Sequence, residues 1–240
     1  MKKLKRVQPV EAAVEQIEWY IQKNQLKPHA KLPGEREMCE VWNLNRSTLR
    51  SAIARLVEER VLYSEKGSGT YVAPPRLERN LQDLKSTTEA MRGTGYFLWT
   101  EVLHSGIEEC DKYIAAKLEI PIGTKVFYLK RLRIRNNIPL IIESSYIDYG
   151  RCENIEKHNF SEESLYKVLR DSGIVLEKGE ESIEITYATE REASLLKVEP
   201  GQYMFYISGC TKDPEGKPVE FFKNVANPDQ ILFTSTLKRL

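Results

Sequence analysis

The chain has 240 residues, of which 41% are hydrophobic and 30% are charged, and its net charge is +1. This composition is typical of a folded globular protein, and the length exceeds that of one average domain. No segment approaches the roughly 18 consecutive apolar residues of a membrane-spanning helix, which argues against an integral membrane protein.

The N-terminal segment, residues 1–9, is basic but lacks the apolar run of about 7 to 15 residues found in secretory signals. We therefore expect a cytoplasmic protein whose cysteines are reduced. The four cysteines and three histidines show no metal-binding spacing. The sequence thus predicts neither a metal site nor a cofactor.

The charge is unevenly distributed along the chain. Residues 1–76 carry 14 Lys and Arg against 9 Asp and Glu, a net charge of +5, and the remaining residues have a net charge of −4. A positive module joined to a mildly acidic one is typical of a polyanion-binding domain with a partner domain. The Pro74-Pro75 pair indicates a stiff joint between them. We predict a first domain over 1–75, a linker over 76–83 and a second domain over 84–240.

Two helices are predicted at the start of the first domain. The first has an apolar stripe with helical spacing, formed by Val10, Val14, Ile17 and Ile21. The second is short and begins after Gly34, an acceptable N-cap residue. It would bury Met38 and either Val41 or Trp42.

A third helix is predicted to begin after Asn45, a good N-cap residue. Its inward face consists of Leu49, Ile53 and Leu56. The exposed residues at its N-terminal end are Arg46, Ser47, Thr48 and Arg50. The N-terminal end of a recognition helix enters the major groove of DNA, where arginine donates two hydrogen bonds to guanine and hydroxyls hold phosphates.

A β-hairpin should follow, with short strands at 61–64 and 70–72 around a glycine-rich tip. Glycine lets the backbone approach a sugar-phosphate wall closely, and Lys66 adds a positive charge at the tip. Three helices and a hairpin, in this order, are typical of a winged helix-turn-helix domain.

Three sequence blocks in the first domain resemble a known family. The blocks KLPGERE, NRSTLRSAIARLVEERVLY and GSGTYV occur in this order within residues 9–73, and they resemble the DNA-binding domain of GntR-type transcription regulators. The resemblance implies that Arg36, Arg46 and Arg50 contact operator DNA and that Ser47 and Thr48 contact phosphates. It places the wing tip, formed by Gly67, Ser68, Gly69 and Thr70, near the minor groove, next to Lys66. Gly34 and Asn45 stand where the family usually has serine, and both are acceptable caps.

The second domain alternates strand-like and helical segments without a regular βαβ pattern. Helices are predicted at 111–118, 162–171 and 190–196. Strands are predicted at 125–135, 140–147, 180–188, 203–212, 218–225 and 233–237. The fold class is therefore α+β, an N-terminal winged helix-turn-helix followed by an α+β domain with a mainly antiparallel sheet.

The strand at 125–135 places Arg131, Arg133 and Arg135 on one face together with apolar residues. A buried guanidinium group needs an anionic partner. If residues 136–138 form a three-residue loop, Arg131 stands opposite Glu143 on the next strand, and the two charges share a face. A two-residue loop would place Glu143 on the other side.

The blocks RLRIRNNIPLIIESSYI, SLYKVL and DPEGKPVEFF resemble the effector-binding UTRA domain of HutC-type GntR regulators, whose fold is related to chorismate lyase. The resemblance covers residues 84–240. In members that sense phosphorylated amino sugars, the corresponding residues hold the phosphate or the sugar hydroxyls. Here they are Thr87, Thr88, Arg131, Arg133, Glu143, Ser164, Tyr166 and Glu220, with Ser86 as an alternative hydroxyl. The segment after Glu220 departs from the usual family ending, and this affects the identity of the effector.

Paired guanidinium groups beside a hydroxyl also favour an anion on physical grounds. The alternative is that Arg131 and Glu143 form an internal ion pair and that Ser164 only caps a helix. We expect a homodimeric repressor that binds double-stranded operator DNA and a small anionic metabolite, best a sugar phosphate. Other hypotheses are a sensor of a non-phosphorylated organic acid or amino-acid derivative, an architectural DNA-binding protein without an effector, and an enzyme on a chorismate-lyase-like fold. No nucleophile with a base, metal spacing or P-loop indicates catalysis.

Overall fold

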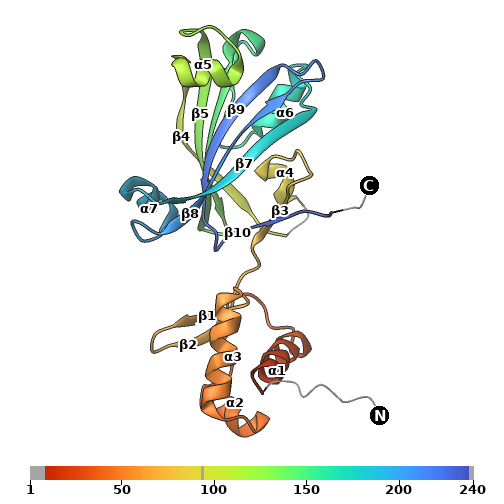
Figure 1. The fold of residues 1–240 in the computed structure, drawn as a ribbon, viewed down its shortest axis with the longest axis vertical. Coiled ribbons are helices and arrows are strands. Elements are labelled where there is room, and N and C mark those ends of the chain that lie inside the picture. The colour runs from red at the N-terminus through yellow and green to blue at the C-terminus, as the bar shows by residue number, and fades with distance from the viewer. Residues whose placement is uncertain (1–8, 93–94, 238–240) are drawn as a thin grey trace. The chain divides into compact units, whose positions relative to one another are not determined.

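The computed structural model describes residues 9–92 and 95–237, so residues 1–8 of the predicted first domain lie outside it. The chain divides into two compact units, with the boundary between Arg76 and Leu77 (Figure 1). None of the helices in the described ranges is long and apolar enough to span a bilayer.

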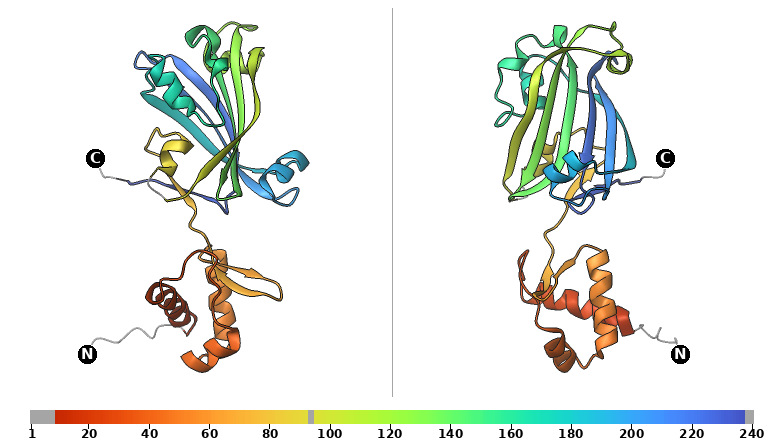
Figure 2. Two further views of the ribbon diagram at one scale, coloured as in Figure 1. Left: turned by 180° about the vertical axis from the view of Figure 1, so that it is seen from behind. Right: turned by 90° about the vertical axis from the view of Figure 1, so that its left-hand side faces the viewer.

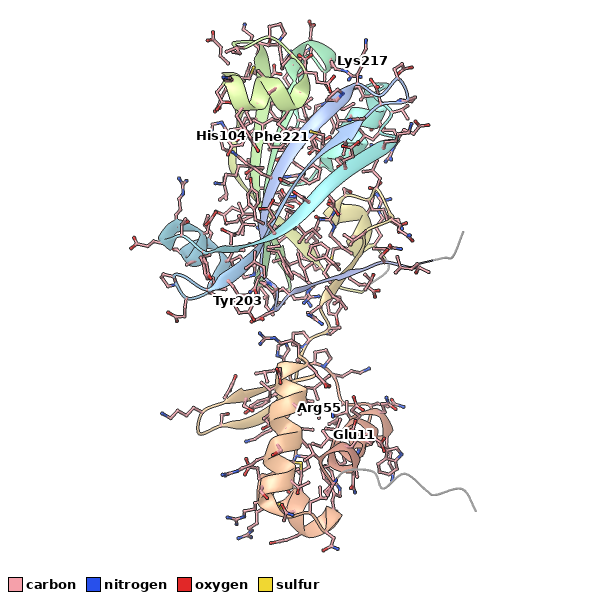
Figure 3. All side chains as sticks on the ribbon, viewed as in Figure 1. Glu11, Arg55, His104, Tyr203, Lys217 and Phe221 are labelled. Carbon is pink, nitrogen blue, oxygen red and sulfur yellow. The ribbon has the colours of Figure 1, made fainter. Side chains whose placement is uncertain are left out.

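The first unit has the predicted order of three helices and a hairpin. Its elements are α1 (Pro9–Lys23), α2 (Glu35–Trp42), α3 (Arg46–Glu58), β1 (Leu62–Glu65) and β2 (Gly69–Val72). Apolar faces of all three helices enclose one core with Leu62 and Val72 of the hairpin. In α2, Met38 is buried and Trp42 packs against Tyr20, whereas Val41 is 71% exposed. At the surface, Glu11 of α1 pairs with Arg55 of α3 at 3.1 Å (Figure 3).

The second unit is built on a six-stranded antiparallel sheet with the strand order β4-β5-β6-β9-β8-β7. Its strands are β4 (Leu98–Glu109), β5 (Lys125–Arg135), β6 (Ile138–Asp148), β7 (Lys178–Tyr187), β8 (Tyr203–Lys212) and β9 (Pro218–Ala226). A separate parallel pair joins β3 (Leu77–Asn80) to β10 (Ile231–Thr234). The predicted α+β class with a mainly antiparallel sheet is therefore confirmed.

Short helices cover the two faces of this sheet (Figure 2). They are α4 (Thr87–Met91), α5 (Lys112–Leu118), α6 (Leu165–Asp171) and α7 (Glu190–Leu196), with 3₁₀ turns η1 (Tyr149–Arg151) and η2 (Ile155–Lys157). On one face, α6 packs on residues of β5 and β6, and α4 packs with β3 and β10 on β6, β8 and β9. On the other face, α5 and α7 form two further apolar clusters. Because side chains alternate between the two faces along β5, Phe127 and Leu129 pack on one face of the sheet, and Val126 and Leu132 pack on the other.

The structure corrects several predicted boundaries. The predicted linker 76–83 contains β3, which pairs with β10, so the second unit begins at Leu77 instead of near Leu84. The helix predicted from residue 162 begins at Leu165, because Asn159 and Glu163 form a hydrogen-bonded turn before it. The strand predicted at 233–237 is β10, which lies two to three residues earlier. Strand β4 and helix α4 were not predicted.

The connection between β5 and β6 is the shorter of the two alternatives considered from the sequence. Asn136 and Asn137 form a two-residue turn with φ values of 46° and 69°, and Arg135 pairs with Ile138. A β-bulge then shifts the register between Arg133 and Ile134. Because the bulge inserts one residue, Arg131 still stands opposite Glu143. Contrary to the expectation from the sequence, the two-residue loop therefore does not move Glu143 to the other face, and Arg131 and Glu143 are paired.

Candidate functional site

The N-terminal end of α3 presents an exposed polar surface. Asn45 caps the helix, because its side-chain oxygen accepts hydrogen bonds from the backbone N–H of Thr48 and from the hydroxyl of Ser47. Arg46, Ser47 and Arg50 are exposed around this cap. The unpaired N–H groups of a helix start attract anions such as phosphate.

Two arginines near this surface are held by carboxylates of α2. Arg50 pairs with Glu35 at 2.8 Å, and Arg36 pairs with Glu40 at 3.5 Å. Both pairs are solvent-exposed, with 68% and 82% exposure for the two arginine side chains. Exposed pairs of this kind are weak. Both guanidinium groups can therefore exchange their carboxylate for another partner at little cost.

A further lysine, Lys31, lies beside the tip of the hairpin. Lys31 forms an isolated bridge with Tyr71 of β2, and its Nζ lies 6.0 Å from the Tyr71 ring centroid. Its side chain crosses Gly69, where a Cβ would lie 2.8 Å from Lys31 Cε. Gly69 has a φ of 141°, a conformation that favours glycine. Sequence reasoning named the tip residues but missed Lys31, which lies far from the tip in sequence.

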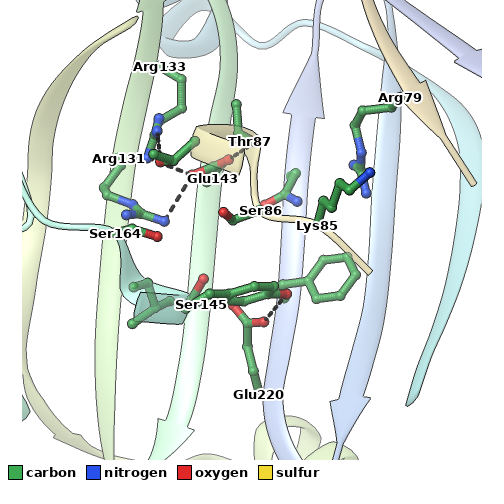
Figure 4. A pocket seen from close by; sticks show the side chains of 15 residues that line it. Arg79, Lys85, Ser86, Thr87, Arg131, Arg133, Glu143, Ser145, Ser164 and Glu220 are labelled. Carbon is green, nitrogen blue, oxygen red and sulfur yellow. Dashed lines mark hydrogen bonds and ion pairs between the residues drawn. The ribbon is translucent and has the colours of Figure 1, made fainter. Parts of the chain in front are cut away.

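All eight residues predicted to hold an effector line one pocket in the second unit. They come from α4, β5, β6, β9 and the start of α6 (Figure 4). The sheet supplies the floor, and the segment around Thr87 and Thr88 lies over it. We call this pocket the anion chamber, after the arginines in its wall.

The centre of the anion chamber is a buried charge cluster. Arg131 Nη2 lies 3.0 Å from Glu143 Oε2, and Arg133 Nη1 lies 3.6 Å from the same oxygen. Arg133 also donates to the Thr88 hydroxyl at 2.6 Å, and the Thr87 hydroxyl donates to Glu143. The three charged residues are 3–8% exposed. One carboxylate therefore serves two buried guanidinium groups.

This cluster leaves hydrogen-bond donors unused. Within the described residues, Nε and Nη1 of Arg131 and Nε of Arg133 are buried and lack a hydrogen-bond partner. Burial alone would raise the pKa of Glu143, but the charges of Arg133 and Arg131 hold the pKa below its ordinary value. Glu143 is therefore ionised at neutral pH, and the cluster carries one excess positive charge. A second anion beside it would balance that charge.

A second carboxyl group lies at the other end of the chamber. Glu220 accepts a hydrogen bond from the Tyr166 hydroxyl at 3.0 Å and is 3% exposed. Burial raises the pKa of Glu220, and burial together with the Glu220 carboxyl raises the pKa of Tyr166 well above its ordinary value. A carboxyl group and a phenol side by side offer both hydrogen-bond acceptors and a donor, which suits ligand hydroxyls.

Several lining residues were missed by sequence reasoning. They are Arg79, Lys85, Ser145, Leu165, Phe222 and Asn224, and the alternative hydroxyl Ser86 lines the chamber as well. In Figure 4, Arg79 and Lys85 lie on the opposite side of the chamber from Arg131. Arg79 belongs to β3, in the predicted linker, so nothing local indicated that it faces a pocket. Ser145 follows Glu143 by two residues on β6, and the period-two rule could have found it.

Comparisons with known proteins agree with this architecture. Residues 9–72 match the family model of bacterial regulatory proteins of the gntR family, and residues 94–231 match the UTRA domain. The chain is 30% identical over 227 residues to the HTH-type transcriptional repressor NagR of Bacillus subtilis, covering 95% of this chain and 93% of that protein. It is 27% identical to the histidine utilization repressor of Pseudomonas aeruginosa over 195 residues, covering 81% and 78% of the two chains.

A solved structure has the same fold. The crystal structure of PhnF from Mycobacterium smegmatis matches with a TM-score of 0.72 and 22% identity, over 94% of this chain and 99% of that one. The matched families and relatives are transcription regulators and not enzymes. A GntR helix-turn-helix followed by a UTRA domain, together with the extent of the match to NagR, establishes the family: the chain belongs to the GntR family of DNA-binding transcription regulators, in its HutC-type branch with a UTRA domain.

Proposed function

We propose that this protein is a homodimeric, cytoplasmic repressor whose affinity for an operator changes when a small anionic metabolite, best a sugar phosphate, binds the UTRA domain. One observation carries the effector assignment: two buried guanidinium groups share a single carboxylate and keep unused donors. Forked guanidinium donors suit phosphate and carboxylate oxygens.

For operator binding, we propose base contacts by Arg46 and Arg50 in the major groove, supported by their exposure at the start of α3. Ser47, Thr48 and Arg36 would hold phosphates or bases beside them. The wing tip would lie at the minor groove, with Lys66, Gly67, Ser68, Gly69 and Thr70. A two-fold symmetric dimer presents two equivalent helices to two half-sites.

Selection from a pool of random duplexes with the full chain would yield an operator, against which variants are titrated by fluorescence anisotropy. The double variant Arg46→Ala and Arg50→Ala should lose about 10- to 100-fold in affinity per base contact at matched ionic strength. Arg191→Ala, an exposed arginine in α7, is the matched control. Unchanged affinity of the double variant would refute the assignment.

The effector is tested by a thermal-shift screen against sugar phosphates, organic acids and amino acids. Compounds that bind should lose affinity in Arg133→Ala and in Ser164→Ala. The Ser164 hydroxyl makes no capping hydrogen bond to α6, so Ser164→Ala should fold normally. A screen without hits, or hits unaffected by both variants, would contradict the anion site. A monomer in analytical ultracentrifugation, with and without DNA, would contradict the dimer.

A second candidate is a non-phosphorylated organic acid or amino-acid derivative. Guanidinium groups bind carboxylate as readily as phosphate, and one relative is a histidine utilization repressor. The same screen separates the two candidates, because it contains both compound classes.

A further inference from the structure

A second cavity adjoins the anion chamber, and we call it the side chamber. The two share Arg79, Lys85, Tyr166 and Phe222 as a common wall. Beyond this wall, the side chamber is lined by the segment 81–84 and by residues at the start of β7, including Gly179. Because four residues border both spaces, the two spaces are direct neighbours.

The sizes of the two spaces show how a ligand would be divided between them. The anion chamber has a free volume of about 50 Å³, and the side chamber has about 170 Å³. The space beside Arg131 and Arg133 therefore suits a compact anionic group. The side chamber, on the other side of Lys85 and Tyr166, offers more room for the body of a larger ligand than the anion chamber does.

The charges of the two spaces are opposite. Four cations line the anion chamber, against Glu143 and Glu220. The side chamber adds no cation beyond the shared Arg79 and Lys85 among its described lining residues, and it adds the acids Asp83, Glu177, Glu180 and Glu181. A molecule that spans both spaces thus passes from a positive to a negative environment.

The acids of the side chamber differ in how well they are neutralised. Asp83 pairs with Lys85 at 2.5 Å and Glu181 pairs with Arg79 at 3.1 Å. Glu180 is 81% exposed and reaches Lys212 of the neighbouring strand. Glu177 has the weakest of these pairs, at 3.9 Å from the exposed Lys178. Its side chain is 51% exposed, and its backbone N–H donates to the backbone carbonyl of Lys212.

We propose that the effector is a two-part molecule, with an anionic head held by Arg131 and Arg133 and a cationic amine at its far end beside Glu177. This inference rests on the anion site proposed above. It assigns the effector to the class of phosphorylated or carboxylated compounds that carry an amine several bonds from the anion. The amine would replace the weakly bound Lys178 at Glu177, and the anion would balance the excess positive charge of the arginines.

The probes are two matched series, n-alkyl phosphates and ω-aminoalkyl phosphates of two to six carbons, together with inorganic phosphate. Their binding to the full-length protein is measured by isothermal titration calorimetry. At the longer chain lengths, the amine should tighten binding at least tenfold over the alkyl phosphate of equal length. Equal affinities of the two series, or a preference for the plain alkyl chain, would overturn the two-part ligand while leaving the anion site intact.

Two variants locate the effect in the side chamber. Glu177→Gln should remove most of the advantage of the amine, whereas Glu184→Gln, an equal loss of charge elsewhere on β7, should keep it. Gly179→Val should block the long probes, because the added side chain occupies space in the side chamber. Its Cβ would lie 2.8 Å from Leu84 Cδ1, and the flexible Leu84 side chain can move away, so the variant should still fold. Ser182→Val on the same strand is its control. Retention of the amine advantage in both Glu177→Gln and Gly179→Val would refute the proposal.

The outcomes separate the two levels of inference. If no phosphate of either series binds the wild-type protein, the anion site itself fails. If both series bind with equal strength and lose affinity in Ser164→Ala, the anion site stands and the amine site fails. Circular dichroism and thermal unfolding of each variant show that a lost response does not come from misfolding.

Discussion

Arg131 on β5 and Glu143 on β6 stand opposite each other in one antiparallel pair, and their side chains form a buried ion pair of 3.0 Å. The same carboxylate also faces Arg133, so the pair is one part of a three-charge cluster. An anionic ligand here would complete an existing internal ion pair, so an internal ion pair and a bound anion do not exclude each other.

Loss of the central carboxylate should be severe. In Glu143→Gln, two buried guanidinium groups lose their counter-charge, and the free energy of unfolding should fall by about 3–5 kcal/mol at neutral pH. Chemical denaturation measures this change, with the exposed Glu184→Gln as control. Saturating phosphate should restore part of the loss, because it supplies a substitute negative charge.

The same variant has a predicted pH dependence. The folded-state pKa of Glu143 is lowered, so its contribution to stability is present above the unfolded pKa, near 4.5, and disappears as the pH falls through the folded value. The stability difference between wild type and Glu143→Gln should therefore shrink in acid. A difference that stays constant from pH 7 to pH 3 would contradict this ionisation.

Glu220 should behave in the opposite way. Its folded-state pKa is raised by burial, so the folded state binds more protons than the unfolded state between the two pKa values. The contribution of Glu220 to the stability should then fall as the pH rises from about 4.5 through the folded pKa. Relative to Glu220→Gln, which lacks this titration, the wild type should therefore lose stability over that range. The test is a series of denaturation curves of both proteins from pH 4 to pH 9, and a stability difference that stays constant over this range would contradict the raised pKa.

A serine at the start of α2 should stabilise the first unit. Gly34 occupies the N-cap position in an extended conformation, and no atom lies within 4 Å of the place that a Cβ would take. In Gly34→Ser, the hydroxyl can accept from the N–H of Glu37, and the gain should be a few tenths of a kcal/mol. Gly34→Ala, which cannot cap, should be less stable than the wild type. Thermal unfolding distinguishes the two.

The wing tip should be sensitive to substitution at Gly69. In Gly69→Ala, the φ of 141° is strained and the new Cβ meets Lys31, so we expect a loss of about 1–3 kcal/mol in stability and weaker operator binding. Gly67→Ala is strained at a φ of 76° but has no neighbour within 4 Å, so its effect should be smaller. Equal effects of the two variants would show that Lys31 is unimportant for the wing.

Elements with a local signal could be predicted from the sequence, and those that depend on distant partners could not. Strand β5 was predicted with its observed bounds because its alternation is regular and both faces are partly apolar. Strand β4 was missed because it is an edge strand whose residues are mostly exposed on both faces. Strand β3 was missed because its partner β10 follows about 150 residues later.

The site shows the same division. The residues from recognisable blocks, such as Arg131, Arg133 and Tyr166, all reach the chamber. Arg79 and part of the side chamber lining, residues 81–83, come from the segment predicted to be a polar linker, so their position depends on the pairing of β3. The turn at Asn136 and Asn137 shows a further limit, because a bulge compensated for a loop of unexpected length.

The pairing of β3 with β10 also has a consequence for biosynthesis. The segment that leaves the first unit is hydrogen-bonded to the final strand, with Leu77 N–H donating to the carbonyl of Gln230 and Leu81 N–H to that of Thr234. On the ribosome, β10 emerges about 150 residues after β3, so the three-helix unit has time to fold while its outgoing strand still awaits a partner. A premature stop codon that removes β10 would leave that strand permanently unpaired, in a protein whose DNA-binding unit is already complete.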